Sequence, residues 1–150
     1  MADLPRILVL NGPNLNMLGV REPAIYGSTT LKDIESLCVQ TGAEVGLSVV
    51  CKQSNHEGVM IDAIHDALTQ SMAGIVINAG AYTHTSIALH DALKMTGLPV
   101  MEVHLSNVYA RESFRHHSTI SSVASGVLCG LGVDGYVFAL RRLANLLAST

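Results

Sequence analysis

The feature that most constrains the fold is an alternation of short, continuous apolar runs with amphipathic stretches, repeated about every 25 to 30 residues. Apolar runs bounded by Gly, Pro, Asn or Ser predict strands that are buried on both faces of a sheet. Five strands are predicted, at Arg6–Leu10, Leu47–Lys52, Gly74–Asn78, Val100–His104 and Gly126–Leu131. The rhythm is typical of βα units, so the chain is expected to form an α/β domain on a parallel sheet.

The stretches between the strands carry apolar residues three or four positions apart, which predicts helices with one buried face. Thr30 and Asn55 are expected to cap two of these helices, and Gly97 is expected to end a third. The last helix should begin near Gly135 and bury Val137, Leu140, Ala144 and Leu147. We therefore expect one domain over residues 1–150, a doubly wound five-stranded parallel sheet with helices on both faces, in flavodoxin-like strand order.

Composition narrows the possible partners. Hydrophobic residues make up 49% of the chain and charged residues 14%, against about 25% charged in a typical domain, so the surplus apolar surface predicts burial between subunits. With a net charge of −3 and nine dispersed Lys and Arg residues, nucleic acid is not expected as a partner. The sequence contains no run that would cross a membrane. Three scattered cysteines, at Cys38, Cys51 and Cys129, favour a cytoplasmic location.

Ligand sites in doubly wound sheets lie at the carboxyl ends of the strands. Seventeen residues, Asn11 to Gly27, follow the first strand before a helix can begin, whereas such loops usually have about 2 to 6 residues. This excess predicts a lid or binding loop that carries Arg21 and Tyr26. The alternative is a surface loop without a function, in which the apolar parts of both side chains lie along the protein and their polar ends reach the solvent.

Polar residues also follow the third and fourth strands. Asn78 and His84 lie in a stretch of small polar residues before a helix N-terminus, which suits an anion or a hydroxylated ligand, although His84 would equally serve as a cap or a core residue. Glu102 and His104 are two positions apart on one strand and so face the same side. A carboxylate beside an imidazole fixes its tautomer and favours its protonated form, which suits a general acid. A structural ion pair is the alternative for these two residues.

Several other classes of site fit poorly. Gly130 to Gly135 matches the dinucleotide-binding pattern, but no second strand follows to supply an acid for the ribose. His116 and His117 lack further ligands at a useful spacing, so no metal is expected. Cys38 and Cys51 are expected in the core, and the Gly-x-Ser-x-Gly pattern of hydrolases is absent. A receiver domain would need acidic residues after its first strand and an aspartate at the end of its third, where this chain has Asn11 and Asn78. A flavin carrier would need a Ser/Thr/Gly phosphate loop after the first strand, where this chain has a long loop with Pro and Asn.

The polar segments together are similar, in order and spacing, to those of the type II 3-dehydroquinate dehydratases. The resemblance covers residues 6–147 and is carried by Asn11-Gly12-Pro13-Asn14-Leu15, Arg21-Glu22-Pro23 with Tyr26-Gly27, Gln53-Ser54-Asn55-His56-Glu57-Gly58, Asn78-Ala79-Gly80 with Thr83-His84-Thr85-Ser86, and Glu102-Val103-His104-Leu105-Ser106-Asn107. Val20, Ala24 and Met60 replace residues that are often more polar in the family, and none of the three is a catalytic position.

The resemblance implies dehydration of 3-dehydroquinate to 3-dehydroshikimate by an anti elimination through an enolate, without metal, nucleotide or Schiff base. It implies Tyr26 as a tyrosinate base, with Arg21 on the same loop. An unperturbed phenol titrates at about pH 10, so its ionisation at neutral pH costs about 4 kcal/mol. A cation about 4 Å away offsets roughly that amount. Either Arg21 or Arg115 could supply this cation.

The resemblance further assigns His104, oriented by Glu102, as the acid that protonates the departing hydroxyl, and Asn14 as a group near the enolate oxygen. Substrate binding is assigned to Asn78, His84, Leu105, Ser106 and Arg115, with Asp91 reaching the site of a neighbouring subunit. That last assignment implies trimers assembled into a homododecamer. A type I route would need an imine-forming lysine, and the chain has only Lys32, Lys52 and Lys94, the first and last on predicted helices.

Overall fold

The sheet is the centre of the fold. The computed structural model describes residues 3–20, 24 and 28–149. Within this part of the chain, five strands pair in parallel in the order β2-β1-β3-β4-β5. The strands are β1 (Arg6–Asn11), β2 (Ser48–Gln53), β3 (Gly74–Asn78), β4 (Val100–His104) and β5 (Gly126–Cys129). This is the flavodoxin-like order, so the predicted fold class is confirmed.

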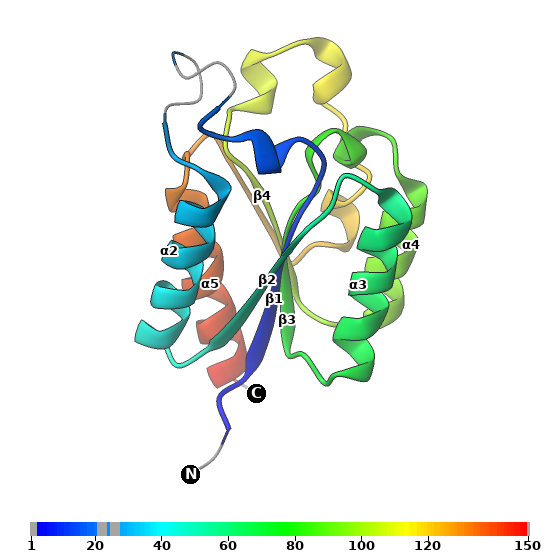
Figure 1. Cartoon of the computed structure of the whole chain (residues 1–150). Coiled ribbons are helices and arrows are strands. Elements are labelled where there is room, and N and C mark those ends of the chain that lie inside the picture. Colours follow the sequence, from blue (N-terminus) through cyan, green and yellow to red (C-terminus); the bar gives the residue numbers. More distant parts are fainter. Residues whose placement is uncertain (1–2, 21–23, 25–27, 150) are drawn as a thin grey trace.

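Two layers of helices cover the sheet (Figure 1). The helices are α2 (Leu31–Glu44), α3 (Glu57–Thr69), α4 (Ile87–Thr96) and α5 (Asp134–Ala148). Figure 1 shows α2 and α5 on one face and α3 and α4 on the other. Both faces of each central strand are therefore buried, which explains the continuous apolar runs in the sequence.

Alternate residues of β1 belong to two separate cores. Leu8 and Leu10 pack in the core that α3 and α4 cover. Ile7 and Val9 pack in the core that α2 and α5 cover, and all four side chains are at most 1% exposed. Polar side chains on the central strands are consequently tolerated only near the strand ends, where the two cores stop.

Short 3-10 helices lie in the loops. They are η1 (Leu15–Met17), η2 (Gly80–His84), η3 (Val108–Ala110), η4 (Ser113–Arg115) and η5 (Ser121–Val123). Figure 1 shows most of them at the end of the sheet opposite the chain termini, which is the carboxyl end of the strands. The described part of the chain contains no helix that is both long and apolar enough to cross a membrane.

Two of the three predicted helix boundaries are confirmed. Thr30 caps α2: its hydroxyl accepts a hydrogen bond from the Asp33 backbone N–H at 3.1 Å, and the Asp33 carboxylate accepts one from Thr30 in return. Gly97 ends α4 in the left-handed conformation, with a φ of 66°. The predicted cap at Asn55 is wrong, because α3 begins after His56 and the Asn55 side chain binds the loop that follows β1.

The predicted buried stripe of the last helix is only partly correct. Leu140 is buried, but Val137, Ala144 and Leu147 are half-buried. The fully buried residues of α5 are Gly135, Tyr136, Ala139, Leu140 and Leu143. The observed buried stripe lies about one position earlier along the helix. It places the Tyr136 hydroxyl against Asn11 and Asn78, the last residues of β1 and β3.

Some predicted strand ends are displaced by one or two residues. β1 continues to Asn11 and β2 runs from Ser48 to Gln53. β5 stops at Cys129, because the φ of Gly130 is 82°, outside the conformations that a strand can use. The loop after β1 therefore begins at Gly12.

Candidate active site

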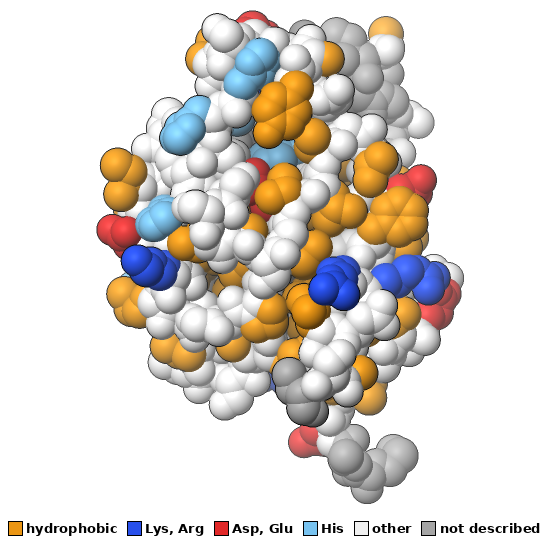
Figure 2. Space-filling view, turned by 180° about the vertical axis from the view of Figure 1, so that it is seen from behind, with side chains coloured by type: hydrophobic (Ala, Val, Ile, Leu, Met, Phe, Trp, Pro, Cys, Tyr) orange, Lys and Arg blue, Asp and Glu red, His pale blue; other side chains and the backbone are white. Residues whose placement is uncertain are grey.

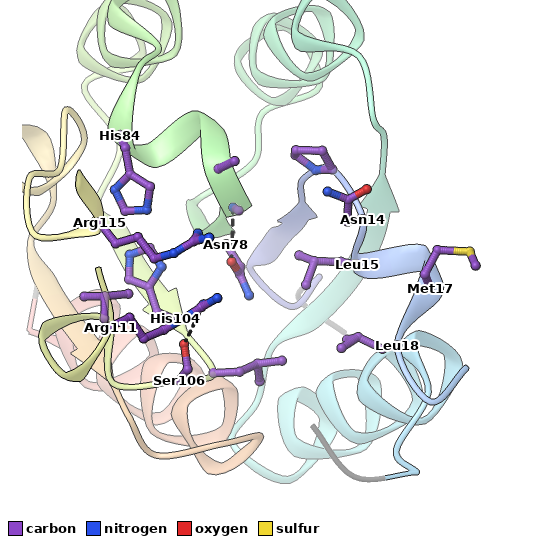
Figure 3. A pocket seen from close by; sticks show the side chains of 15 residues that line it. Asn14, Leu15, Met17, Leu18, Asn78, His84, His104, Ser106, Arg111 and Arg115 are labelled. Atoms are coloured by element: carbon purple, nitrogen blue, oxygen red, sulfur yellow. Dashed lines mark hydrogen bonds between the residues drawn. The ribbon is translucent and has the colours of Figure 1, made fainter. Parts of the chain in front are cut away.

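A cavity of about 230 Å³ lies at the carboxyl ends of β1, β3 and β4. Figure 3 shows Asn14, Leu15 and Met17 on one side of it, His84, Arg115, Arg111 and His104 on the other, and Asn78 between them. The described residues that line it are Pro13, Asn14, Leu15, Met17, Leu18, Asn78, Gly80, Ala81, His84, His104, Leu105, Ser106, Val108, Arg111 and Arg115. The predicted convergence of three strand ends on one site is therefore present.

Glu102 and His104 form the buried pair that strand alternation predicts. The Nε2 of His104 lies 2.5 Å from a carboxylate oxygen of Glu102, and the residues are 7% and 1% exposed. An ionised carboxylate only accepts hydrogen bonds, so Nε2 carries the hydrogen of this bond. His104 also lines the cavity. Its other ring nitrogen, Nδ1, is therefore the one that remains to exchange a proton.

Two serines from the far side of the site also bind the Glu102 carboxylate. The Ser121 hydroxyl donates to Oε1 at 2.7 Å, and the Ser118 hydroxyl lies 3.1 and 3.0 Å from the two oxygens. Burial raises the pKa of Glu102, but the hydrogen bonds from His104 and the serines outweigh it, and the pKa lies below its ordinary value. Glu102 is thus a buried, ionised acceptor that fixes the tautomer of His104.

Asn14 is positioned by the end of β2. Its backbone lies in the left-handed region, with a φ of 70°, which asparagine adopts more readily than most residues. The Asn14 backbone N–H donates to Oδ1 of Asn55 at 3.0 Å, and the Gln53 side chain donates to the same oxygen and to the Gly12 carbonyl, each at 3.1 Å. A β-carbon on Gly12 would lie 2.4 Å from the carbonyl oxygen of Ala79, so the loops after β1 and β3 are in direct backbone contact.

The end of β3 is held by a buried set of hydrogen bonds. Asn78 pairs in register with Asn11 of β1, and Tyr136 of α5 lies within hydrogen-bond distance of both side chains. Burial raises the pKa of Tyr136 above its ordinary value. The Asn78 carboxamide is therefore held by a hydrogen bond to Tyr136, while Asn78 also lines the cavity.

The cavity favours an anionic or oxygen-rich ligand. Its described lining includes two arginines and two histidines and no acidic residue. Arg111 donates to the Ser106 hydroxyl at 3.3 Å, which Figure 3 draws, and Arg115 forms an ion pair with Glu112. The Nδ1 of His84 lies 2.8 Å from the His117 carbonyl oxygen, which can only accept, so Nδ1 carries the hydrogen and Nε2 is left for other partners.

Eight of the predicted site residues meet at this place. Seven of them line the cavity: Asn14, Asn78, His84, His104, Leu105, Ser106 and Arg115. The eighth, Glu102, lies behind His104 and is hydrogen-bonded to it. Asp91 is exposed on α4 and is not part of the lining, so its predicted role toward a neighbouring subunit stays a prediction. Arg21 and Tyr26 lie outside the described residues.

The residues that hold the site from behind were not predicted. They are Ser118 and Ser121 behind Glu102, Gln53 and Asn55 behind Asn14, and Tyr136 behind Asn78. Only Gln53 and Asn55 carried a signal, as parts of a polar segment at a predicted strand end. As for metal ligands, the described residues contain no group of three His, Cys, Asp or Glu side chains placed to bind an ion.

The hydrogen bond from Ser121 should stabilise the fold in a pH-dependent way. Because the pKa of Glu102 is lowered on folding, its charge adds stability that is fully present above the unfolded pKa, about 4.3, and is lost as the pH falls through the folded pKa. Ser121→Ala removes one of the bonds that lower this pKa. We expect the variant to lose about 1 kcal/mol of unfolding free energy at neutral pH and less at about pH 3.

Urea unfolding at a series of pH values measures this difference. Ser122→Ala, at the exposed neighbouring position, is the matched control and should leave the profile unchanged. An equal loss in Ser121→Ala at every pH would mean that the serine does not act through the charge of Glu102.

Comparisons with known proteins identify the family. The family model described as dehydroquinase class II matches residues 5–144. A protein of Rhodopseudomonas palustris strain HaA2 named 3-dehydroquinate dehydratase is 62% identical over 92% of this chain and 91% of its own. One of Agrobacterium fabrum named 3-dehydroquinate dehydratase 1 is 60% identical, over 95% and 97% of the two chains.

A solved structure agrees with these sequence matches. The crystal structure of type II dehydroquinase from Propionibacterium acnes superposes with a TM-score of 0.90 at 46% identity, over 97% of this chain and 99% of that one. Sequence and fold therefore match over nearly the whole of both chains, and the chain belongs to the class II dehydroquinase family.

Proposed function

We propose that this protein is a hydro-lyase that converts 3-dehydroquinate to 3-dehydroshikimate by an anti elimination through an enolate. The observation that carries the proposal is the buried Glu102–His104 pair, with His104 at the wall of a cavity that has arginines and no described acidic residue. This arrangement supplies a proton donor beside a pocket for an anion. The kinship with proteins named 3-dehydroquinate dehydratase supports the substrate.

The first step is the removal of a proton from C2, next to the ketone. Tyr26, as a tyrosinate, takes this proton, and the electron pair of the C–H bond moves into the enolate of C2, C3 and the ketone oxygen. Arg21 is proposed to stabilise the tyrosinate, since the charge of Arg115 is already shared with Glu112. Asn14, at the cavity wall, provides a hydrogen-bond donor for the enolate oxygen or for a water beside it.

The second step expels the C1 hydroxyl. The enolate reforms the ketone, a double bond forms between C1 and C2, and the C1–O bond breaks as His104 gives its proton to the departing oxygen. The products are the conjugated ketone and water. Ionised Glu102 accepts a hydrogen bond from Nε2 of His104 and so fixes the tautomer of His104 after the step.

Binding groups are proposed around these two centres. Asn78 and the backbone N–H groups of Leu105 and Ser106 take the substrate carboxylate, while His84 and Arg115 hold the ring hydroxyls. All five line the cavity. A substrate carboxylate can accept hydrogen bonds from these donors without repulsion from an acidic side chain, because the described lining contains none.

Turnover of 3-dehydroquinate, followed by ultraviolet absorbance of the conjugated product, is the direct test. We expect absorbance to rise with purified protein and no added cofactor. Borohydride added together with substrate should leave the activity intact, because the mechanism forms no imine. Lys32, Lys52 and Lys94 are all absent from the described cavity lining. Loss of activity with a reduced substrate–lysine adduct in the mass spectrum would contradict the mechanism, and absence of turnover would contradict the function.

The base is tested by Tyr26→Phe and Arg21→Ala. Each variant should lose kcat by orders of magnitude, since a proton next to a ketone is not removed without a positioned base. Circular dichroism should show that both variants stay folded. A Tyr26→Phe enzyme with a near-normal rate would eliminate Tyr26 as the base.

We also propose that the protein assembles into trimers and these into a homododecamer, in which Asp91 reaches the site of a neighbouring subunit. Large apolar side chains remain exposed on the single chain, among them Ile87, Met95, Tyr109 and Phe114, each at least 64% exposed. Figure 2 shows hydrophobic side chains at many places on one face, with few charged ones between them. The free thiols of Cys38, Cys51 and Cys129 fit the cytoplasmic location that we propose, which cell fractionation tests.

A mixing experiment tests the shared site. Asp91→Ala and His104→Ala should each be inactive alone, but co-expression should restore activity in about a quarter of the sites. Those sites combine His104 of one chain with the intact Asp91 of its neighbour. If Asp91 served its own chain, no mixed oligomer would contain a complete site and activity would not return.

A further inference from the structure

The structure assigns a role to Tyr136 of α5: we propose that it is a positioning residue that fixes which hydrogen-bonding group Asn78 presents to the substrate. This inference rests on the proposed function of Asn78 in substrate binding. Tyr136 does not line the cavity, and it is 0% exposed. It therefore acts through Asn78 and not by touching a ligand.

The order of the hydrogen bonds follows from the number of hydrogens available. The Tyr136 hydroxyl oxygen lies 2.5 Å from Oδ1 of Asn11 and 3.0 Å from Nδ2 of Asn78. A phenol has one hydrogen, and it goes to Oδ1 of Asn11. The same oxygen then accepts a hydrogen from Nδ2 of Asn78.

The backbone of Gly80 decides against the reversed arrangement. Its N–H donates to Oδ1 of Asn78 at 3.3 Å. If the Asn78 carboxamide were turned over, Nδ2 would face the Gly80 N–H, donor against donor. Because Asn78 is only 4% exposed, water could not satisfy these two donors, and the reversed arrangement would lose hydrogen-bond energy. The Gly80 N–H and the Tyr136 oxygen therefore select one orientation together.

The consequence is that Asn78 presents an Nδ2 donor to the cavity. Its Oδ1 is turned to Gly80 and one of its two Nδ2 hydrogens is used by Tyr136, which leaves the second Nδ2 hydrogen for a ligand. This group donates to a ligand oxygen, such as that of a carboxylate, whereas an amide nitrogen cannot accept a hydrogen bond from a ligand N–H. Tyr136 thus contributes to the preference of the site for an oxygen ligand.

The protonation state of Tyr136 keeps this order constant. Burial raises its pKa above the ordinary value, so the phenol retains its hydrogen throughout the working range of the enzyme. The donor to Asn11 is therefore always present. Asn11 itself has a buried Nδ2 with no hydrogen-bond partner among the described residues, so within this part of the chain the Tyr136 hydroxyl is the side-chain partner of its carboxamide.

A double-mutant cycle tests the role of Tyr136. Tyr136→Phe removes the hydroxyl and leaves the ring in the core. We expect KM for 3-dehydroquinate to rise about tenfold, with kcat changed by less than about threefold, because Asn78 binds the substrate equally well before and during the reaction. In the Asn78→Ala background the same substitution should change KM by less than about twofold.

Other outcomes of the cycle overturn the proposal. An unchanged KM in Tyr136→Phe would do so, and so would an equal increase in both backgrounds, since a merely structural loss adds to that of Asn78→Ala. Ser149→Ala is the control: it removes an exposed hydroxyl at the end of α5, and its KM and kcat should remain those of the wild type. If Tyr136→Phe does not fold, Asn11→Ala frees the hydroxyl from its acceptor and should raise KM in the same way.

A crystal structure of Tyr136→Phe separates this proposal from the proposed function. Without the phenol oxygen, the Asn78 carboxamide should turn or occupy more than one position. A single, unchanged orientation with the Gly80 hydrogen bond intact would overturn the role of Tyr136, whatever the activity. Absence of 3-dehydroquinate turnover by the wild-type protein would instead refute the proposed function.

Discussion

A parallel sheet that is covered on both faces leaves few places for polar side chains, and this constraint organises the rest of the structure. Along the inner strands the apolar side chains pack in one of two cores, so a polar group among them would lose its hydration without compensation. At the carboxyl ends the cores stop and the loops supply hydrogen-bond partners. Asn11, Asn78, Glu102 and His104 all lie in the last three residues of their strands.

The buried charge of Glu102 shows how the loops meet this demand. A carboxylate with 1% exposure needs donors from several directions, and β4 itself supplies only His104. The remaining donors come from the segment after η4, where Ser118 also accepts hydrogen bonds from the backbone N–H groups of Ile120 and Ser121. One charge therefore orders both His104 and the chain that runs behind it. The sequence shows only the Glu102–His104 pair, whereas the structure shows a network that also includes Ser118 and Ser121.

The parts of the fold that could be predicted are those set by local chemistry. The positions of the strands followed from the apolar runs, and the cap at Thr30 and the stop at Gly97 are decided by neighbours within three or four residues. The cap at Asn55 failed because its side chain is used by Asn14, a contact across 41 positions that no local pattern contains. Tyr136 was missed for the same reason, since its partners on β1 and β3 are 125 and 58 positions away.

In the candidate site, too, the features that depend on local sequence could be predicted and those that depend on distant contacts could not. The groups that face the cavity could be predicted because polar residues at a strand end are unusual beside apolar strands. The groups that support them, such as Ser121 behind Glu102, carry no such contrast, because a serine in a loop is ordinary. The length of the loop after the first strand predicted a lid that carries Arg21 and Tyr26, and the resemblance predicted their roles. Both residues lie outside the described residues.

The backbone contact between Gly12 and Ala79 also limits how the site can change. With no space for even a methyl group between the two loops, a shift of one carries the other along, and the groups around Asn14 and Asn78 move as one wall. The opposite wall, which carries Arg111 and Arg115, consists of the short turns of η3 and η4, with a hydrogen bond from Arg111 to Ser106 between its own side chains. Altered ligand preference, whether by evolution or by design, is therefore easier to reach through residues 105–115 than through the loops after β1 and β3.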